Sequence, residues 1–167
     1  MKMLVLAVAL LAPSLLGAQA KSSIKVTHNG ETRLALGTKA DGVTVMLRTH
    51  EVKAPELNDE FELQPDSPCT ASRIPCLLTD ALKIEVDGRA IRLPYSAYAD
   101  LSDMEGLTLT RSGAEYVLTI VGGDAAGSYI AKLKFNRSRL LNRVVAPGED
   151  SAQPSERTEY YNPKRFE

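Results

Sequence analysis

The sequence predicts an all-β protein: an antiparallel β-sandwich or an open β-barrel built from hairpins, with at most one short helix. Two observations lead to this fold class. Apolar and polar residues alternate with a period of two through most of the chain after residue 20. Turns rich in Gly, Asn and Asp separate the alternating segments at regular intervals, as in sandwiches and barrels. The 3.6-residue apolar repeat of an amphipathic helix is nearly absent.

Residues 1–20 have the layout of a secretory signal peptide. Lys2 supplies a positive charge, residues 4–16 are almost wholly apolar, and Ala18-Gln19-Ala20 is a small-x-small cleavage pattern. The apolar run is shorter than the roughly 20 residues that span a bilayer. We expect cleavage before Lys21, no membrane span after processing, and export to the bacterial periplasm or the extracellular space.

The first strands are expected to form a hairpin. Residues 23–28 alternate, Asn29-Gly30 is typical of a type I′ turn, and residues 32–36 continue the alternation. Further strands are predicted at residues 43–48 and 61–63. The chain from 21 to 161 is predicted to be a single β-rich domain, and residues 162–167 a flexible tail.

The clearest hairpin covers residues 82–93, with Asp87-Gly88 as its two-residue turn. The turn sets Val86 opposite Arg89, which places Ile84 opposite Ile91 and Leu82 opposite Leu93. All the large apolar side chains then lie on one face. Because a single register satisfies both the turn and the burial, we expect this pairing in the structure.

Pro94 ends this segment, and Ser96 is the expected N-cap of one or two helical turns. Further strands are predicted at residues 107–110, 116–121, 128–135, 140–145 and 157–161, the first two around a turn at Ser112-Gly113. The tyrosines suggest where the core ends. Tyr95 and Tyr98 suit one face of a helical turn, and alternation buries one of Tyr160 and Tyr161 while exposing the other.

Cys69 and Cys76 are the two cysteines, and their spacing in an exported chain predicts a structural disulfide worth about 2–3 kcal/mol. The enclosed run, Cys-Thr-Ala-Ser-Arg-Ile-Pro-Cys, resembles the reactive loop of Bowman–Birk-type serine-protease inhibitors. That resemblance covers eight residues and implies Ala71 at the specificity position. The ring is one residue shorter than in that family, Ile74-Pro75 replaces a Pro-Pro pair, and the family's dense cysteine framework is absent.

A glycine-rich loop between two predicted strands is the candidate partner-contact site, because exposed backbone and a tyrosine anchor suit recognition. Its residues are Gly122, Gly123, Asp124, Gly127, Ser128 and Tyr129. The alternative is a hairpin loop whose glycines adopt positive φ values. A phosphate-binding loop is excluded because no lysine precedes Ser128 and strands flank both sides. A single carboxylate is too few for calcium.

Composition and motifs leave function open. The net charge is −1 and the charges are interspersed, which predicts no attraction to nucleic acid. No cofactor motif, metal-ligand cluster or catalytic serine elbow is present, and Glu149, Asp150, Glu156 and Glu159 suit a solvated surface. We expect a non-catalytic domain that binds another macromolecule, as an inhibitor or envelope accessory protein. The alternatives are a carrier of a small apolar ligand and a hydrolase using His28 or His50.

Overall fold

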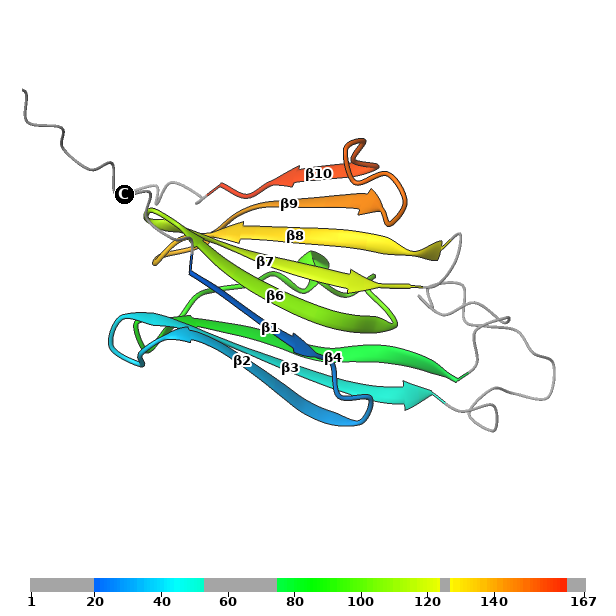
Figure 1. The fold of residues 1–167 in the computed structure, drawn as a ribbon, viewed down its shortest axis with the longest axis horizontal. Coiled ribbons are helices and arrows are strands. Elements are labelled where there is room, and N and C mark those ends of the chain that lie inside the picture. Colours follow the sequence, from blue (N-terminus) through cyan, green and yellow to red (C-terminus); the bar gives the residue numbers. More distant parts are fainter. Residues whose placement is uncertain (1–19, 53–74, 124–126, 162–167) are drawn as a thin grey trace, which may run out of the picture.

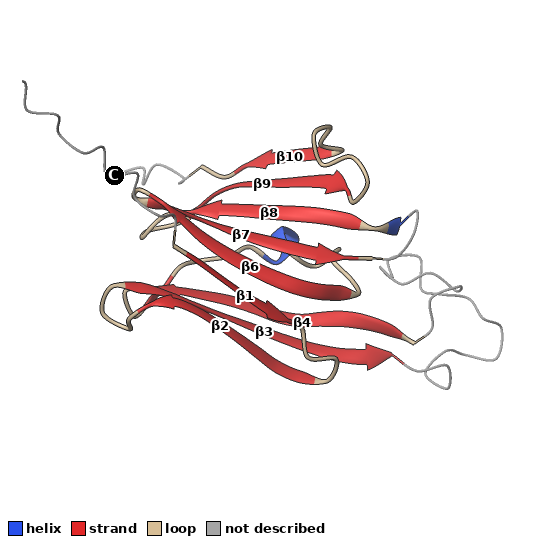
Figure 2. Cartoon of the chain, in the orientation of Figure 1, coloured by secondary structure: helices blue, strands red, loops and turns tan. Residues whose placement is uncertain are grey.

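The computed structural model describes residues 20–52, 75–123 and 127–161, and these residues form two antiparallel sheets (Figure 1). The larger sheet has the order β1-β6-β7-β8-β9-β10, with β1 Lys21–Lys25, β6 Met104–Ser112, β7 Glu115–Gly122, β8 Tyr129–Phe135, β9 Leu140–Pro147 and β10 Glu156–Glu159. The smaller sheet has the order β2-β3-β4-β5, with β2 Gly30–Gly37, β3 Gly42–Val52, β4 Cys76–Val86 and β5 Arg89–Ala90. The all-β prediction is confirmed, and the two separate sheets match the sandwich (Figure 2).

Several predictions fall on residues that the structure does not describe. These are the signal peptide apart from Ala20, the strand at 61–63, Cys69 and most of its loop, Asp124, and the tail at 162–167. Within the described residues, no helix is long and apolar enough to cross a membrane.

The core lies between the two sheets and is built from alternating strand residues. On β7, Tyr116, Leu118 and Ile120 are at most 1% exposed, and on β4 Ile84 is completely buried. The Tyr116 and Phe135 rings stack with centroids 5.6 Å apart. Period-two burial is what the sequence pattern predicts for strands with one inward face.

The predicted hairpin at 82–93 is confirmed at its turn and in the register next to it, but the expected pairing of Leu82 with Leu93 is not part of the sheet. Asp87 and Gly88 have φ values of 52° and 75°, as a type I′ turn requires, and Val86 pairs with Arg89. The Ile91 N–H donates to the Ile84 carbonyl at 2.9 Å. The second strand is short, however, because β5 ends at Ala90, and the long partner of β4 is β3.

The predicted hairpin between the first two strands is wrong. β1 pairs with β6 in the larger sheet, whereas β2 pairs with β3 in the smaller sheet. The chain changes sheet between them, and side chains hold the crossing. Thr49 Oγ1 donates to the Thr27 carbonyl at 2.6 Å, and Asn29 Oδ1 accepts the Glu51 N–H at 2.9 Å. Alternation predicted the strands correctly, but it carries no information on which strand each one pairs with.

The predicted helix is a single 3₁₀ turn, η3 (Tyr95–Ala97), whose N-cap is Pro94 and not Ser96. No side chain caps it. The connection from β5 to β6 that contains η3 packs Ala97, Tyr98 and Leu101 into the core. This connection therefore completes the cover over the core that the short β5 leaves open.

Four turns gather at one end of the sandwich, which we call the hairpin end. They comprise residues 38–41, 87–88, 113–114 and 136–139, on the left in Figure 1. Ion pairs tie the sheets together here. Arg137 Nε lies 2.7 Å from Asp87 Oδ2, and Arg137 Nη2 lies 3.4 Å from Asp41 Oδ1. The chain after β10 also returns to this end.

Candidate binding groove

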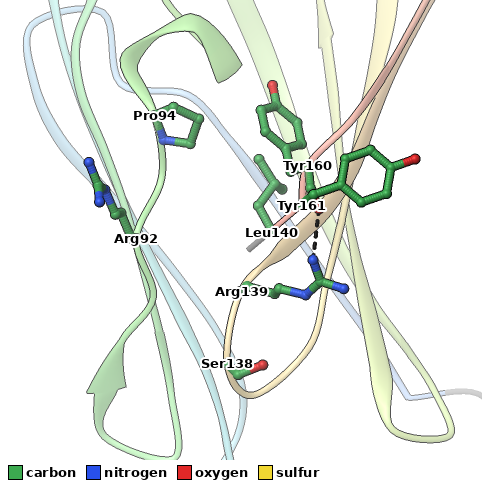
Figure 3. Close-up of a pocket in the computed structure, with 7 residues that line it drawn as sticks. All are labelled: Arg92, Pro94, Ser138, Arg139, Leu140, Tyr160 and Tyr161. Atoms are coloured by element: carbon green, nitrogen blue, oxygen red, sulfur yellow. Dashed lines mark hydrogen bonds between the residues drawn. The ribbon is translucent and has the colours of Figure 1, made fainter. Parts of the chain in front are cut away.

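A groove of about 350 Å³ opens at the hairpin end (Figure 3). Three segments line it: Arg92 and Pro94 after β5, Ser138, Arg139 and Leu140 at the start of β9, and Tyr160 and Tyr161 after β10. The first segment continues from the smaller sheet and the other two belong to the larger sheet. The groove therefore lies where the chain leaves the smaller sheet after β5, beside two segments of the larger sheet.

The wall that contains Arg139 is held by a network of hydrogen bonds. The Asn136 side-chain oxygen accepts the N–H groups of Ser138 and Arg139 at 2.9 and 3.1 Å, which closes the turn before β9. Arg139 Nη1 then donates to the Tyr160 carbonyl at 2.8 Å, as the dashed line in Figure 3 shows. The Tyr160 N–H donates to the Leu141 carbonyl at 2.9 Å. These contacts fix the wall before any ligand binds.

The groove displays exposed tyrosine at its rim. Tyr161 is 82% exposed, whereas Tyr160 is half-buried, which confirms the alternation predicted for this pair. Burial raises the pKa of Tyr160, against the opposing charge of Arg143. Tyr95, next to the lining residue Pro94, is 65% exposed and meets Tyr98 edge-on with ring centroids 5.4 Å apart. Each of these rings offers an apolar face and a polar hydroxyl.

A buried arginine holds β10, the strand that precedes Tyr160 and Tyr161. Arg143 on β9 has a side chain that is 3% exposed. Its Nη2 bonds Asp100 Oδ2 at 2.5 Å, its Nη1 bonds both carboxylate oxygens of Glu156 at 2.5 Å, and its Nε has no hydrogen-bond partner among the described residues. Glu156 also accepts a bond from Thr158 at 2.8 Å. Glu156 was expected on a solvated surface, but it is a half-buried partner of Arg143.

This cluster, Arg143, Asp100 and Glu156, links three segments. Asp100 comes from the η3 connection, Arg143 from β9 and Glu156 from the edge strand β10. Burial opposes ionisation of Glu156, but hydrogen bonds from Arg143 and Thr158 outweigh it, so the pKa of Glu156 is lowered. Burial likewise opposes the Arg143 charge, yet its two carboxylate partners raise the pKa of Arg143. Tyr160 and Tyr161 follow in the chain directly after β10, the strand that carries Glu156 of this cluster.

The hairpin end carries more basic than acidic side chains. Its four turns, β5 and the chain after β5 contain five basic residues: Lys39, Arg89, Arg92, Arg137 and Arg139. Among the acidic side chains of the same segments, Asp41 and Asp87 both lie beside Arg137. Within the described residues, Arg92 and Arg139 form no ion pair, and no acidic residue lines the groove.

The predicted glycine-rich contact loop lies at the opposite end of the sandwich from the groove. Gly122 and Gly123 are buried, Gly127 is exposed, and Gly123 has a φ of 74°. The Tyr129 hydroxyl donates to the Ser102 carbonyl at 2.8 Å and lies 2.5 Å from where a Cβ of Gly122 would be. Gly122 thus makes room for Tyr129, which ties β8 to the η3 connection. The role of this loop in partner contact stays a prediction.

Replacing Tyr129 with Phe tests this arrangement. We expect the free energy of unfolding to fall by about 1 kcal/mol, since the substitution removes one hydrogen bond and leaves the Ser102 carbonyl without that donor. Urea unfolding of the two proteins measures the difference. An unchanged midpoint would show that the hydroxyl contributes nothing to folding and is available for another role.

The remaining predicted site residues are dispersed. Cys76 is fully buried at the start of β4, and its expected partner Cys69 lies outside the described residues, so their disulfide stays a prediction. His50 Nδ1 lies 2.6 Å from Asp80 Oδ1. A register shift between β3 and β4 at this point leaves Asp80 with no residue opposite it in the strand pairing. His28 lines a separate pocket of about 160 Å³.

In the described part of the chain, neither histidine is hydrogen-bonded to a nucleophile. Among the described residues, no hydroxyl is hydrogen-bonded to His28 or His50, and no cluster of three metal-ligating side chains occurs. The structure therefore adds no support to the hydrolase alternative. No family model, no curated protein and no solved structure matches this chain.

Proposed function

We propose that this chain is an exported, non-catalytic β-domain that binds another macromolecule through the groove at the hairpin end. The observation that carries the proposal is the rim of tyrosine and arginine around an apolar wall. Tyr and Arg are enriched among the residues that dominate protein interfaces. Tyr161 is 82% exposed and offers a large contact area. Arg139 is held in place by its bond to Tyr160, so it loses little conformational freedom on binding.

Export is part of the proposal, and two features support it. Residues 1–20 have the pattern of a signal peptide, and the first strand, β1, begins at Lys21, directly after the expected cleavage point. Cleavage there would leave every described strand in the processed protein. The Cys69–Cys76 disulfide would form after export, in an oxidising compartment.

The carrier alternative has less support from the described residues. A carrier needs an internal cavity, and the positions between the sheets hold large side chains that are fully buried, including Tyr116, Phe135 and Leu118. The groove, by contrast, opens to the surface and is lined by charged and aromatic residues. This combination suits recognition of a macromolecular surface better than enclosure of an apolar molecule.

Parallel affinity capture tests the proposal. The baits are the wild-type chain, a Tyr161→Ala/Arg139→Gln double variant, and Arg33→Gln as a matched control, because Arg33 is exposed on β2 away from the groove. Extracts of the source organism's envelope and secreted fractions supply the partner. We expect one macromolecule to be retained equally by the wild type and Arg33→Gln, and at least about tenfold less by the double variant, as loss of interface hot spots implies.

The result depends on the comparison and not on capture alone. Circular dichroism of each bait verifies folding, and the high exposure of Tyr161 predicts an unchanged spectrum. Equal retention on all three baits would contradict the groove as the binding site. Retention of a small apolar molecule, with no macromolecule, would instead support the carrier.

A further inference from the structure

We infer that the groove at the hairpin end takes an extended acidic segment of a partner protein. This inference rests on the proposed function and names the chemistry of the partner. The net charge of the chain is −1, which by itself predicts no preference for acidic partners. The fold changes this, because it gathers basic side chains at one end of the sandwich, and two of those at the groove have no carboxylate partner among the described residues.

The arginines that line the groove carry the argument. Arg92 and Arg139 come from opposite walls, and neither forms an ion pair within the described residues. One Arg139 nitrogen is used by the Tyr160 carbonyl, which leaves other N–H groups of the guanidinium to donate. An arginine that is fixed by one bond and open elsewhere suits a carboxylate, because guanidinium and carboxylate pair through two parallel hydrogen bonds.

The rest of the lining indicates a polypeptide. Between the arginines the groove presents Pro94, Leu140 and the tyrosine rings, which would contact apolar side chains of the same segment. Acidic residues alternating with apolar ones in an extended segment would meet both kinds of surface, because successive side chains of an extended chain point to opposite sides. A groove of about 350 Å³ that is open to solvent accommodates such a segment without rearrangement.

A long uniform polyanion fits this end less well. Asp41 and Asp87 lie among the basic turns, where their carboxylates surround Arg137. A nucleic acid or polyphosphate lying across the turns would place its phosphates against these two carboxylates, and like charges repel. A short acidic segment confined to the groove avoids them. The charge pattern therefore favours carboxylates delivered by a polypeptide.

The test is a titration of the ¹⁵N-labelled full chain, expressed with its own leader, followed by NMR. The probe is a capped hexapeptide of alternating Glu and Leu. We expect its addition to shift resonances of residues 92–94, 138–141 and 160–161. The Arg139→Gln and Arg92→Gln variants should each weaken binding about fivefold to tenfold, whereas Arg33→Gln should leave it unchanged. Raising the salt concentration should weaken binding, because the contacts are between partly exposed charges.

Other results would overturn the inference. These are equal binding of the corresponding Lys-Leu peptide, tighter binding of an oligodeoxythymidine, or absence of groove shifts with the Glu-Leu peptide. Groove resonances that shift with protein concentration would make a second copy of the chain the occupant. If the double variant Phe166→Ser/Glu167→Gln shifts the groove resonances of the free protein, the occupant of the groove would be the C-terminal tail of the chain. If the peptide fails while the capture experiment still depends on Tyr161 and Arg139, the groove remains a binding site and only its acidic preference is rejected.

Discussion

Removing both carboxylates that hold Arg143, in the double variant Asp100→Asn/Glu156→Gln, is expected to lower the free energy of unfolding by about 2–3 kcal/mol. The Arg143 side chain is 3% exposed, so the variant leaves a buried positive charge without a counter-ion. Breaking a buried pair from one side costs about 3–5 kcal/mol, and we expect less because the Asp100 and Glu156 side chains are 59% and 41% exposed. Urea unfolding measures the loss.

Adding Arg143→Met to the double variant distinguishes a buried charge from a general loss of packing. Met has a similar length and carries no charge, so the triple variant should regain most of the lost stability. The single Arg143→Met variant should lie within about 1.5 kcal/mol of the wild type, since a buried ion pair is often worth no more than an apolar replacement. A triple variant that is less stable than the double variant would contradict this account.

The pH dependence provides a second readout of the same cluster. The folded protein holds the pKa of Glu156 below its usual value of about 4.3. Between the lowered pKa and the usual one, the unfolded chain binds the proton and the folded protein does not. The stabilisation is therefore complete above the usual pKa and is lost as the pH falls through the lowered one. This acid-dependent loss should shrink in the Arg143→Met variant.

The cluster also bears on binding. β10 is an edge strand of four residues, and Arg143 holds it through Glu156. Tyr160 and Tyr161 follow β10 directly, so loss of the contacts within the cluster should increase the mobility of one wall of the groove. Mobility of a binding wall increases the entropy that must be lost on association. Variants of Asp100 and Glu156 should weaken partner binding although neither residue lines the groove.

The sequence predicted local structure well because local structure depends on local residues. The turn at Asp87-Gly88 fixes its own geometry, since Gly accepts positive φ and Asp tolerates it, and it therefore sets the pairing of Val86 with Arg89. Tyr160 and Tyr161 were separated correctly into a half-buried and an exposed residue by alternation alone. Both cases need only the residues of one segment.

The sequence failed where distant residues meet. Asn29-Gly30 is a sequence typical of a hairpin turn. In the structure, however, the Asn29 side chain accepts a hydrogen bond from the Glu51 N–H, at the point where the chain crosses from one sheet to the other. Arg143 looked like one more residue of an alternating strand, and its partners lie 43 and 13 residues away along the chain. The groove combines residues after β5, before β9 and after β10, so no single stretch of sequence contains its pattern.

The core substitution Phe135→Ala is expected to have the largest effect of the variants considered, a loss of about 3–5 kcal/mol in the free energy of unfolding. Phe135 is completely buried at the end of β8 and its ring stacks on Tyr116, which Arg111 covers with its guanidinium 5.6 Å from the ring centroid. Truncation removes the buried apolar area and the stacking partner of Tyr116, and it leaves a cavity beside that ring which the surrounding strands can close only in part.

The size of this loss separates a binding domain with a filled core from a carrier. Thermal and urea unfolding of Phe135→Ala, beside Lys132→Ala at an exposed position of the same strand, provide the measurement. In a filled core the Phe135 variant loses several kcal/mol, whereas Lys132→Ala stays within about 0.5 kcal/mol of the wild type. A carrier with an apolar cavity beside Phe135 would already lack contacts on one side of the ring. The truncation would then cost only about 1 kcal/mol. That result would favour an internal ligand site over the groove at the hairpin end as the binding site.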